Sequence, residues 1–296
     1  MEGIAQNQSS ALALEKAFIL LTGKELAIDP SIGLGYLSRF AHALENKEKA
    51  FEINKSIEFF NPDLSKVYET ANLSTGVAKE LTSLPKGSII KLYLNDYMAV
   101  NDGLCTLGIQ SLANNLLSYR DNPNISGALL EVNSGGGEVM AGQIMYNAIK
   151  DFKKPVIAIV HNAGSAAYLA IAGVKEIIAS GELSRVGSIG ALISMDKKFI
   201  ETYKGRFEDI YSDLSPDKNA GIRTYIETGD SSILKGSLNE TVKAFQSIVL
   251  SNRQIKKSEE TLKGAMFQAR DAKSRGLIDM IGTEQDALKR LQTYFK

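Results

Sequence analysis

The sequence predicts an α/β protein in which repeated β-α-β units build a largely parallel sheet. Two observations lead to this prediction. Short apolar runs of four to six residues, typical of strands buried on both faces, recur in the later part of the chain, and stretches with helical periodicity separate the first of them. With 296 residues, the chain is also long enough for one large α/β domain and an additional segment.

Residues 1–84 differ in character from the rest. Apolar side chains recur at helical spacing over residues 9–21 and 31–44, with Ser or Asp-Pro signals near the start of each stretch. The remainder of the segment is polar and weakly patterned, and Leu84-Pro-Lys-Gly marks a boundary. We therefore expect a mainly helical amino-terminal extension over 1–84 and a second domain over 85–296.

The elements of the second domain follow from the same patterns. Apolar runs predict strands at 89–94, 127–132, 155–160, 176–179 and 189–193. Helical periodicity predicts helices at 106–119, 138–152, 232–256 and 284–294. The alternation of the early strands with helices is what favours parallel strand pairing.

Charge and cysteine content exclude several classes of protein. Lys and Arg together number 34, as do Asp and Glu, so no net charge attracts nucleic acid or an anionic membrane. Cys105 is alone, which excludes an intramolecular disulfide and a thiolate zinc site, and we expect no metal and no cofactor. Glu15 and Lys16 interrupt the one apolar run near the amino terminus. We therefore expect no targeting segment, no membrane span and a cytoplasmic location.

Ser165 stands where a chain can present a nucleophile. It follows an apolar run, lies among Gly and Ala residues and precedes a short helical stretch, so its hydroxyl can project from a tight turn beside free helix N–H groups. A second apolar run ends in Asn133-Ser-Gly-Gly-Gly, where bare backbone could approach a substrate closely. Together the two turns indicate a nucleophile and an oxyanion hole.

The base that would activate Ser165 is less evident from the residues. The sequence has two histidines, of which His42 lies in the extension and His161 stands four residues before Ser165 on the same strand, where the backbone separates the two side chains. A lysine can serve instead if it is desolvated or lies near other positive charge. The downstream candidates are Lys175, Lys197, Lys198, Lys204 and Lys218, and composition does not choose among them.

Four blocks of the sequence carry a resemblance to a known family. They are Asn133-Ser-Gly-Gly-Gly, Ala163-Gly-Ser-Ala-Ala-Tyr, Arg185-Val-Gly-Ser-Ile-Gly and the closing block from Phe267 to Asp279. In this order and spacing, residues 88–282 resemble the signal peptide peptidase (protease IV) family of serine proteases, which use a Ser-Lys pair. The resemblance implies the fold that this family shares with Clp-type proteolytic subunits and crotonases.

The resemblance also implies roles for individual residues. Ser165 matches the nucleophile, Lys218 the general base, and Ser188 a serine that orients the lysine. The backbone N–H groups of Gly137 and Ala166 match the oxyanion hole.

Two details bear on these roles. Gly135 stands where the family has a proline, which keeps the backbone N–H groups available. Asp217 directly precedes Lys218, and a carboxylate in contact would favour the charged amine, so we expect Asp217 to point into solvent.

The function implied is that of a serine endopeptidase that works through an acyl-enzyme on a polypeptide substrate. A helical extension without a membrane span is similar to the soluble branch of tailed phages and prophages, which processes the capsid scaffold protein during head maturation, in the host cytoplasm or within proheads. A cytoplasmic protease that degrades signal peptides or other peptides is the alternative. Two other classes stay open, a crotonase-like acyl-CoA enzyme and a non-catalytic ring-forming protein.

The resemblance further implies a homo-oligomer, a ring or dome in which neighbouring subunits build one another's substrate groove. We expect the apolar face of the helix at 232–256 to contribute to the contact.

Overall fold

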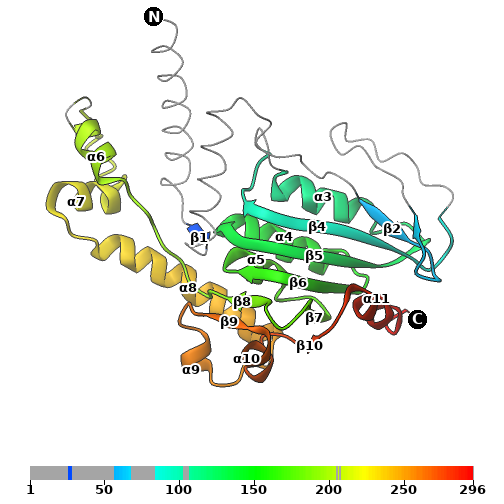
Figure 1. Ribbon diagram of the computed structural model, residues 1–296. Coiled ribbons are helices and arrows are strands. Elements are labelled where there is room, and N and C mark those ends of the chain that lie inside the picture. The colour runs from blue at the N-terminus through cyan, green and yellow to red at the C-terminus, as the bar shows by residue number, and fades with distance from the viewer. Residues whose placement is uncertain are drawn as a thin grey trace, which may run out of the picture.

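The predicted α/β class is confirmed by the computed structural model, in which strands and helices alternate around a largely parallel sheet (Figure 1). The structure describes residues 26–28, 57–67, 84–102, 107–204, 206 and 208–295. The helices predicted at 9–21 and 31–44 lie outside these residues, as do His42 and Cys105. The division of the chain near residue 84 stays a prediction.

The described strands form one sheet with the order β10-β7-β6-β5-β4-β2-β3. Pairing is parallel among β4, β5, β6, β7 and β10, and antiparallel where β2 joins β4 and β3, where β1 joins β5, and where β9 joins β8. The strands are β1 (Leu26–Ile28), β2 (Glu58–Phe60), β3 (Lys66–Val67), β4 (Ser88–Met98), β5 (Ile125–Glu138), β6 (Val156–Gly164), β7 (Glu176–Ala179), β8 (Arg185–Gly187), β9 (Met266–Gln268) and β10 (Met280–Ile281).

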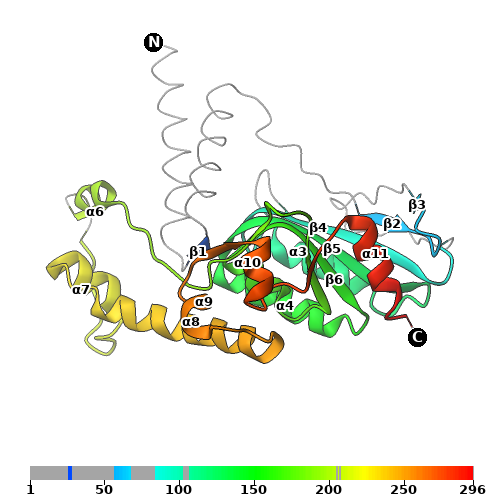
Figure 2. The same ribbon diagram turned by 60° about the horizontal axis from the view of Figure 1, so that its bottom comes forward.

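Helices cover both faces of this sheet (Figures 1 and 2). Within the described residues, the helices are α3 (Ile109–Ser118), α4 (Val139–Asp151), α5 (Ala166–Ile171), α6 (Lys197–Lys204), α7 (Ala220–Thr228), α8 (Ser232–Asn252), α9 (Ser258–Thr261), α10 (Ala269–Ser274) and α11 (Glu284–Gln292). No helix within the described ranges is both long and apolar enough to cross a bilayer.

Consecutive residues of the central strands enter opposite cores. Ile90 and Leu130 pack with α3, α4 and α5, whereas their neighbours Ile89 and Leu129 pack with α11 on the other face. Because side chains alternate across a strand, a strand buried on both faces reads as an unbroken apolar run, which is why these strands were predictable. Each such buried side chain stabilises the fold by about 1.5–3 kcal/mol relative to an exposed one.

Hydrogen bonds and ion pairs fix α11 to the sheet. The Arg290 Nε donates to both carboxylate oxygens of Glu176 at 3.1 Å, and the Tyr294 hydroxyl donates to Glu176 at 2.7 Å. Burial acts to raise the pKa of Glu176, but the hydrogen bonds from Arg290 and Tyr294 outweigh it and the net effect is a lowered pKa. The ionised Glu176 carboxylate of β7 therefore holds α11 against the sheet.

The strand predicted at 189–193 is wrong. The strand in this region is β8, which ends at Gly187 because Gly187 and Ser188 both have positive φ, 129° and 52°. A Cβ at Gly187 would lie 2.4 Å from the Ala265 carbonyl oxygen, so the chain passes closer to its neighbour there than any other residue type allows. The helix predicted at 232–256 ends at Asn252.

Candidate active site

Ser165 occupies a strained turn between β6 and α5. Its φ of 55° and ψ of −120° are rare for a residue with a side chain. Such backbone conformations cost about 1–3 kcal/mol and persist where the surrounding structure enforces them. The serine is 2% exposed, and its two neighbours in the sequence, Gly164 and Ala166, have little or no side chain. A strand, a sharp turn at serine and a helix together form a nucleophile elbow.

The loop after β8 holds this turn in place. The Ser165 N–H donates to the Gly187 carbonyl at 2.8 Å, and the Ser165 Oγ donates to the Gly190 carbonyl at 3.3 Å. Ser188 lies between these two contacts, is half-buried, and donates its N–H to the Ala265 carbonyl at 2.8 Å. The structure therefore brings Ser188 into the loop that contacts Ser165.

The glycine-rich end of β5 lies against the same turn. A Cβ at Gly164 would lie 3.0 Å from the Gly135 carbonyl oxygen, so the elbow and the glycine segment are in direct contact. Ser134 is buried and shapes this segment, because its hydroxyl accepts the Gly136 N–H at 3.1 Å and donates to the Asp96 carbonyl. This role of Ser134 was not predicted, although a Ser one residue before a glycine run is a known way of closing a tight turn.

Two helices support the two candidate oxyanion donors. Ala166 is the fully buried first residue of α5. A Cβ at Gly142 of α4 would lie 2.7 Å from the Ala166 carbonyl oxygen, so α4 and α5 pack closely at this point. Because α4 begins one residue after β5 ends, it follows the glycine segment that contains Gly137. Ser165, Ser188, Ala166 and the segment of Gly137 thus form one cluster.

Lys218 does not belong to this cluster within one chain. It is exposed and lies in the turn that precedes α7. Both views place α6 and α7 at the far end of α8, away from α5 and the sheet (Figures 1 and 2). Asp217 is also exposed, and no ion pair joins it to Lys218. We refer to α6, residues 208–228 and residues 232–240 as the arm.

The other candidate bases are also occupied or distant. The His161 Nε2 lies 2.9 Å from Glu131 and its Nδ1 lies 2.8 Å from the Ser180 hydroxyl, so the ring is held away from Ser165. Lys91 is buried, but it forms ion pairs with Glu131 at 2.6 Å and with Glu284 of α11 at 2.5 Å. The remaining lysines considered from the sequence are exposed: Lys175, Lys197, Lys198 and Lys204.

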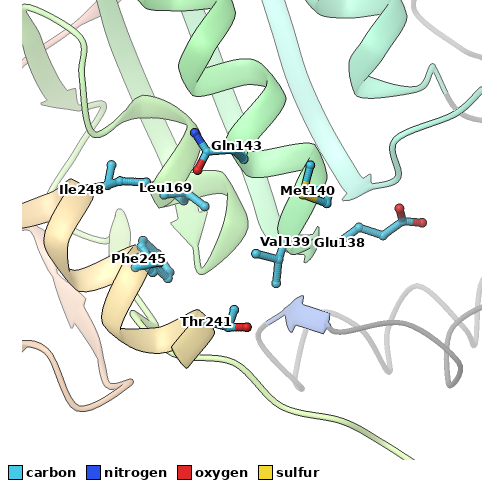
Figure 3. A pocket seen from close by; sticks show the side chains of 9 residues that line it. Glu138, Val139, Met140, Gln143, Leu169, Thr241, Phe245 and Ile248 are labelled. Carbon is cyan, nitrogen blue, oxygen red and sulfur yellow. The ribbon is translucent and has the colours of Figure 1, made fainter. Parts of the chain in front are cut away.

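An apolar pocket of about 500 Å³ adjoins the cluster (Figure 3). Its walls come from the start of α4, from Leu169 of α5 and from α8, where Phe245 and Ile248 contribute. The pocket starts at Glu138, one residue after Gly137. A side chain on a peptide bound next to Ser165 would therefore find an apolar surface within reach.

Residues 148–296 match the family model described as Peptidase family S49, over a range that contains Ser165, Ser188 and Lys218. The chain belongs to peptidase family S49. The predicted signal peptide peptidase resemblance and the predicted serine peptidase class are confirmed by this match. The crotonase-like enzyme and the non-catalytic ring protein are thereby set aside.

A serine protease and putative proteases are among the relatives of this S49 chain. A putative protease of Methanocaldococcus jannaschii is 30% identical over 184 residues, which cover 57% of this chain and 56% of that protein. A putative signal peptide peptidase of Enterococcus faecium is 26% identical over 90% of this chain and 79% of its own length. The chloroplastic serine protease SPPA of Arabidopsis thaliana is 24% identical over 58% of this chain and 26% of its own length. The chain thus spans about half the length of the archaeal relative.

Proposed function

We propose that this S49 protein is a serine endopeptidase in which Ser165 is the nucleophile and Lys218 the general base. The observation that carries the proposal is the strained, buried turn at Ser165, because strain of this kind is kept where a side chain must be presented. Its position against the glycine segment and the loop of Ser188 adds support.

The chemistry follows from this arrangement. The Ser165 oxygen attacks the carbonyl carbon of a peptide bond while its proton passes to the neutral lysine amine. The N–H groups of Gly137 and Ala166 stabilise the oxyanion, the C–N bond breaks, and the leaving amine takes the proton from the lysine. Water, activated by the same lysine, then hydrolyses the acyl-enzyme. Ser188 is the residue that we expect to orient the lysine.

We propose further that a second copy of the chain supplies the lysine. Lys218 is exposed in one chain, whereas an amine that acts as a base near neutral pH must be taken out of water. The arm presents large apolar side chains to solvent around Lys218, with Ile210 and Leu214 92% and 95% exposed. Apolar surface of this kind is typical of an interface, and closed rings repeat one such contact between neighbours.

The substrate is, in this proposal, an unfolded or loosely folded polypeptide, because no P-loop sequence that would power unfolding is present in the chain. The finer form of the proposal is the scaffold protein of a phage capsid, cleaved in the host cytoplasm or in the prohead, and its support is the sequence resemblance alone. The Enterococcus faecium relative, a putative signal peptide peptidase, favours a second candidate substrate, a signal peptide. Cleavage of purified scaffold protein and of a synthetic signal peptide by the same preparation would distinguish them.

Mixed oligomers test both the chemistry and the source of the lysine. We expect Ser165→Ala and Lys218→Ala each to lower cleavage of casein by at least about 10⁴-fold. If the lysine comes from a neighbour, equal amounts of the two variants, dissociated and reassembled together, recover about a quarter of wild-type activity, because random mixing pairs an intact serine with an intact lysine at that frequency.

Three results would contradict parts of the proposal. Undiminished cleavage by Ser165→Ala refutes the nucleophile, and undiminished cleavage by Lys218→Ala refutes the base. Inactive mixtures, with oligomers that demonstrably exchange subunits, refute the supply of the lysine by a second copy. Lys235→Ala, a substitution of another exposed lysine on the arm, is the matched control and should leave activity unchanged.

A further inference from the structure

Strand β1 pairs with the end of β5 that carries Gly137. The pairing is antiparallel, with Leu26 opposite Glu138, Ala27 opposite Gly137 and Ile28 opposite Gly136. The paired residues are more than 100 positions apart in the sequence. A segment from the beginning of the chain therefore lies along the residue whose N–H is the proposed oxyanion donor.

Strand β6 does not cover the edge of β5 along which β1 lies. The β5–β6 ladder ends at Ser134 and Ala163, because β6 then turns into the elbow at Ser165. On its other side, β5 stays paired with β4, where Tyr97 is opposite Gly136 and Met98 is opposite Gly137. After Ser134, one edge of β5 is therefore not paired with β6, and the backbone groups on that edge need another partner, which β1 supplies.

An extended peptide would satisfy the same backbone groups. Peptides commonly bind by adding a strand to an open sheet edge, where main-chain hydrogen bonds supply affinity and adjacent pockets select side chains. Here the apolar pocket begins at Glu138, the residue opposite Leu26, and continues through Val139 and Met140. Figure 3 shows β1, drawn as a pale blue arrow, beside these residues. Edge and pocket together fit an extended peptide with an apolar side chain.

We infer that β1 is an internal occupant of the peptide-binding edge and that a substrate must displace it. This inference rests on the proposed function, because it takes the edge beside Ser165 as the place where substrate binds. Residues 26–28 then compete with every peptide. The apparent affinity for a peptide is the intrinsic affinity multiplied by the fraction of molecules in which the edge is free. The chain limits its own activity until β1 leaves.

Binding measurements without cleavage test this inference. All variants carry Ser165→Ala, and the probe is a fluorescein-labelled synthetic peptide with the sequence of residues 24–30, Lys-Glu-Leu-Ala-Ile-Asp-Pro. We expect Ala27→Pro, which removes a backbone N–H and disfavours the ladder, to tighten probe binding by about tenfold or more. Val67→Pro is the matched control, because it places a proline in β3, at the far edge of the same sheet. It should leave the affinity unchanged.

A reversible lock gives a second, independent measurement. Leu26→Cys with Glu138→Cys, in a chain that also carries Cys105→Ser, places two thiols on directly opposite residues, which lie close enough in an antiparallel pair to form a disulfide. We expect the oxidised protein to bind the probe at least about tenfold more weakly than the same protein after reduction. Glu138→Cys alone should show no dependence on reductant.

The outcomes separate the two proposals. Equal probe affinity in the locked and reduced protein overturns the inference, as does an equal effect of Ala27→Pro and Val67→Pro. Failure of the peptidase proposal would appear elsewhere, as cleavage that survives Ser165→Ala, and would leave these binding results interpretable.

Discussion

Substitution of Gly137 by alanine tests the oxyanion hole most directly. A Cβ at this position would lie 2.2 Å from the Met98 carbonyl oxygen and 2.6 Å from the Met98 nitrogen. Both atoms belong to the backbone of β4, which pairs with β5 at this point, so no side chain can move aside. The strand must instead shift by about 1 Å to reach an ordinary contact distance, and displacements of this size at a reacting centre cost about 10²-fold in rate.

The expected loss can be stated for both activity and stability. Displacement of one oxyanion donor raises the barrier by about 2.7–4 kcal/mol, so we expect kcat/KM for cleavage of casein to fall by about 10²–10³-fold. Overpacking costs about 1–3 kcal/mol of unfolding free energy, which urea titration measures. Gly236→Ala is the control, because no atom lies within 4 Å of its Cβ position.

The reasoning would be refuted by a folded Gly137→Ala protein with wild-type turnover. Turnover and stability must be read together, because an unfolded variant is inactive for a trivial reason. We therefore expect a cooperative urea transition for Gly137→Ala that is displaced from the wild-type midpoint by no more than the overpacking cost. Gly236→Ala should match the wild type in turnover and should be stabilised by up to about 1 kcal/mol, because alanine favours the interior of helix α8 over glycine.

Two further predictions concern stability. Tyr168→Phe removes the hydroxyl that donates to the Leu277 carbonyl at 2.8 Å inside the core, and we expect urea titration to give a loss of about 1–3 kcal/mol; no loss would mean that the carbonyl finds another donor. Glu176→Gln should lower the unfolding free energy at pH 7 by about 1–2 kcal/mol, because the amide carries no charge for Arg290, which is itself half exposed. Since folding lowers the pKa of Glu176 from its usual 4.5, its contribution is present above that pH and is lost as the pH falls below it, so the variant should lose less stability in acid than the wild type; parallel pH profiles would contradict this.

The fold was predictable from sequence where strands are buried on both faces. The runs that became β4, β5 and β6 contain adjacent residues such as Leu129 and Leu130 that enter different cores, and this gives a continuous apolar signal. Strand β1 gave no such signal, because three residues are too short for a period and their pairing depends on where β6 turns away. The strand expected at 189–193 was wrong because two consecutive positive φ values, at Gly187 and Ser188, are set by the approach of another segment.

The candidate site divides in the same way. Ser165 could be identified because small residues between an apolar run and a helix are a local pattern, and the structure adds its strained backbone. The position of Lys218 depends on the position of the arm. Helix α7 of the arm contains no buried residue, so hydrophobic periodicity does not predict where the arm lies. Its role as a base stays a prediction that subunit exchange can test.

The bond between Tyr168 and Leu277 has a consequence for the timing of biosynthesis. It joins the helix that starts at the nucleophile to a residue 109 positions later. Asp279, two residues further on, accepts the Ile177 N–H at 2.7 Å and pairs with Arg253 at 2.7 Å. A nascent chain that has released Ser165 from the ribosome therefore still lacks the partners that bury its helix. The elbow can be completed only after residues 277–279 have left the ribosome, so a nascent chain shorter than this does not hold a finished nucleophile.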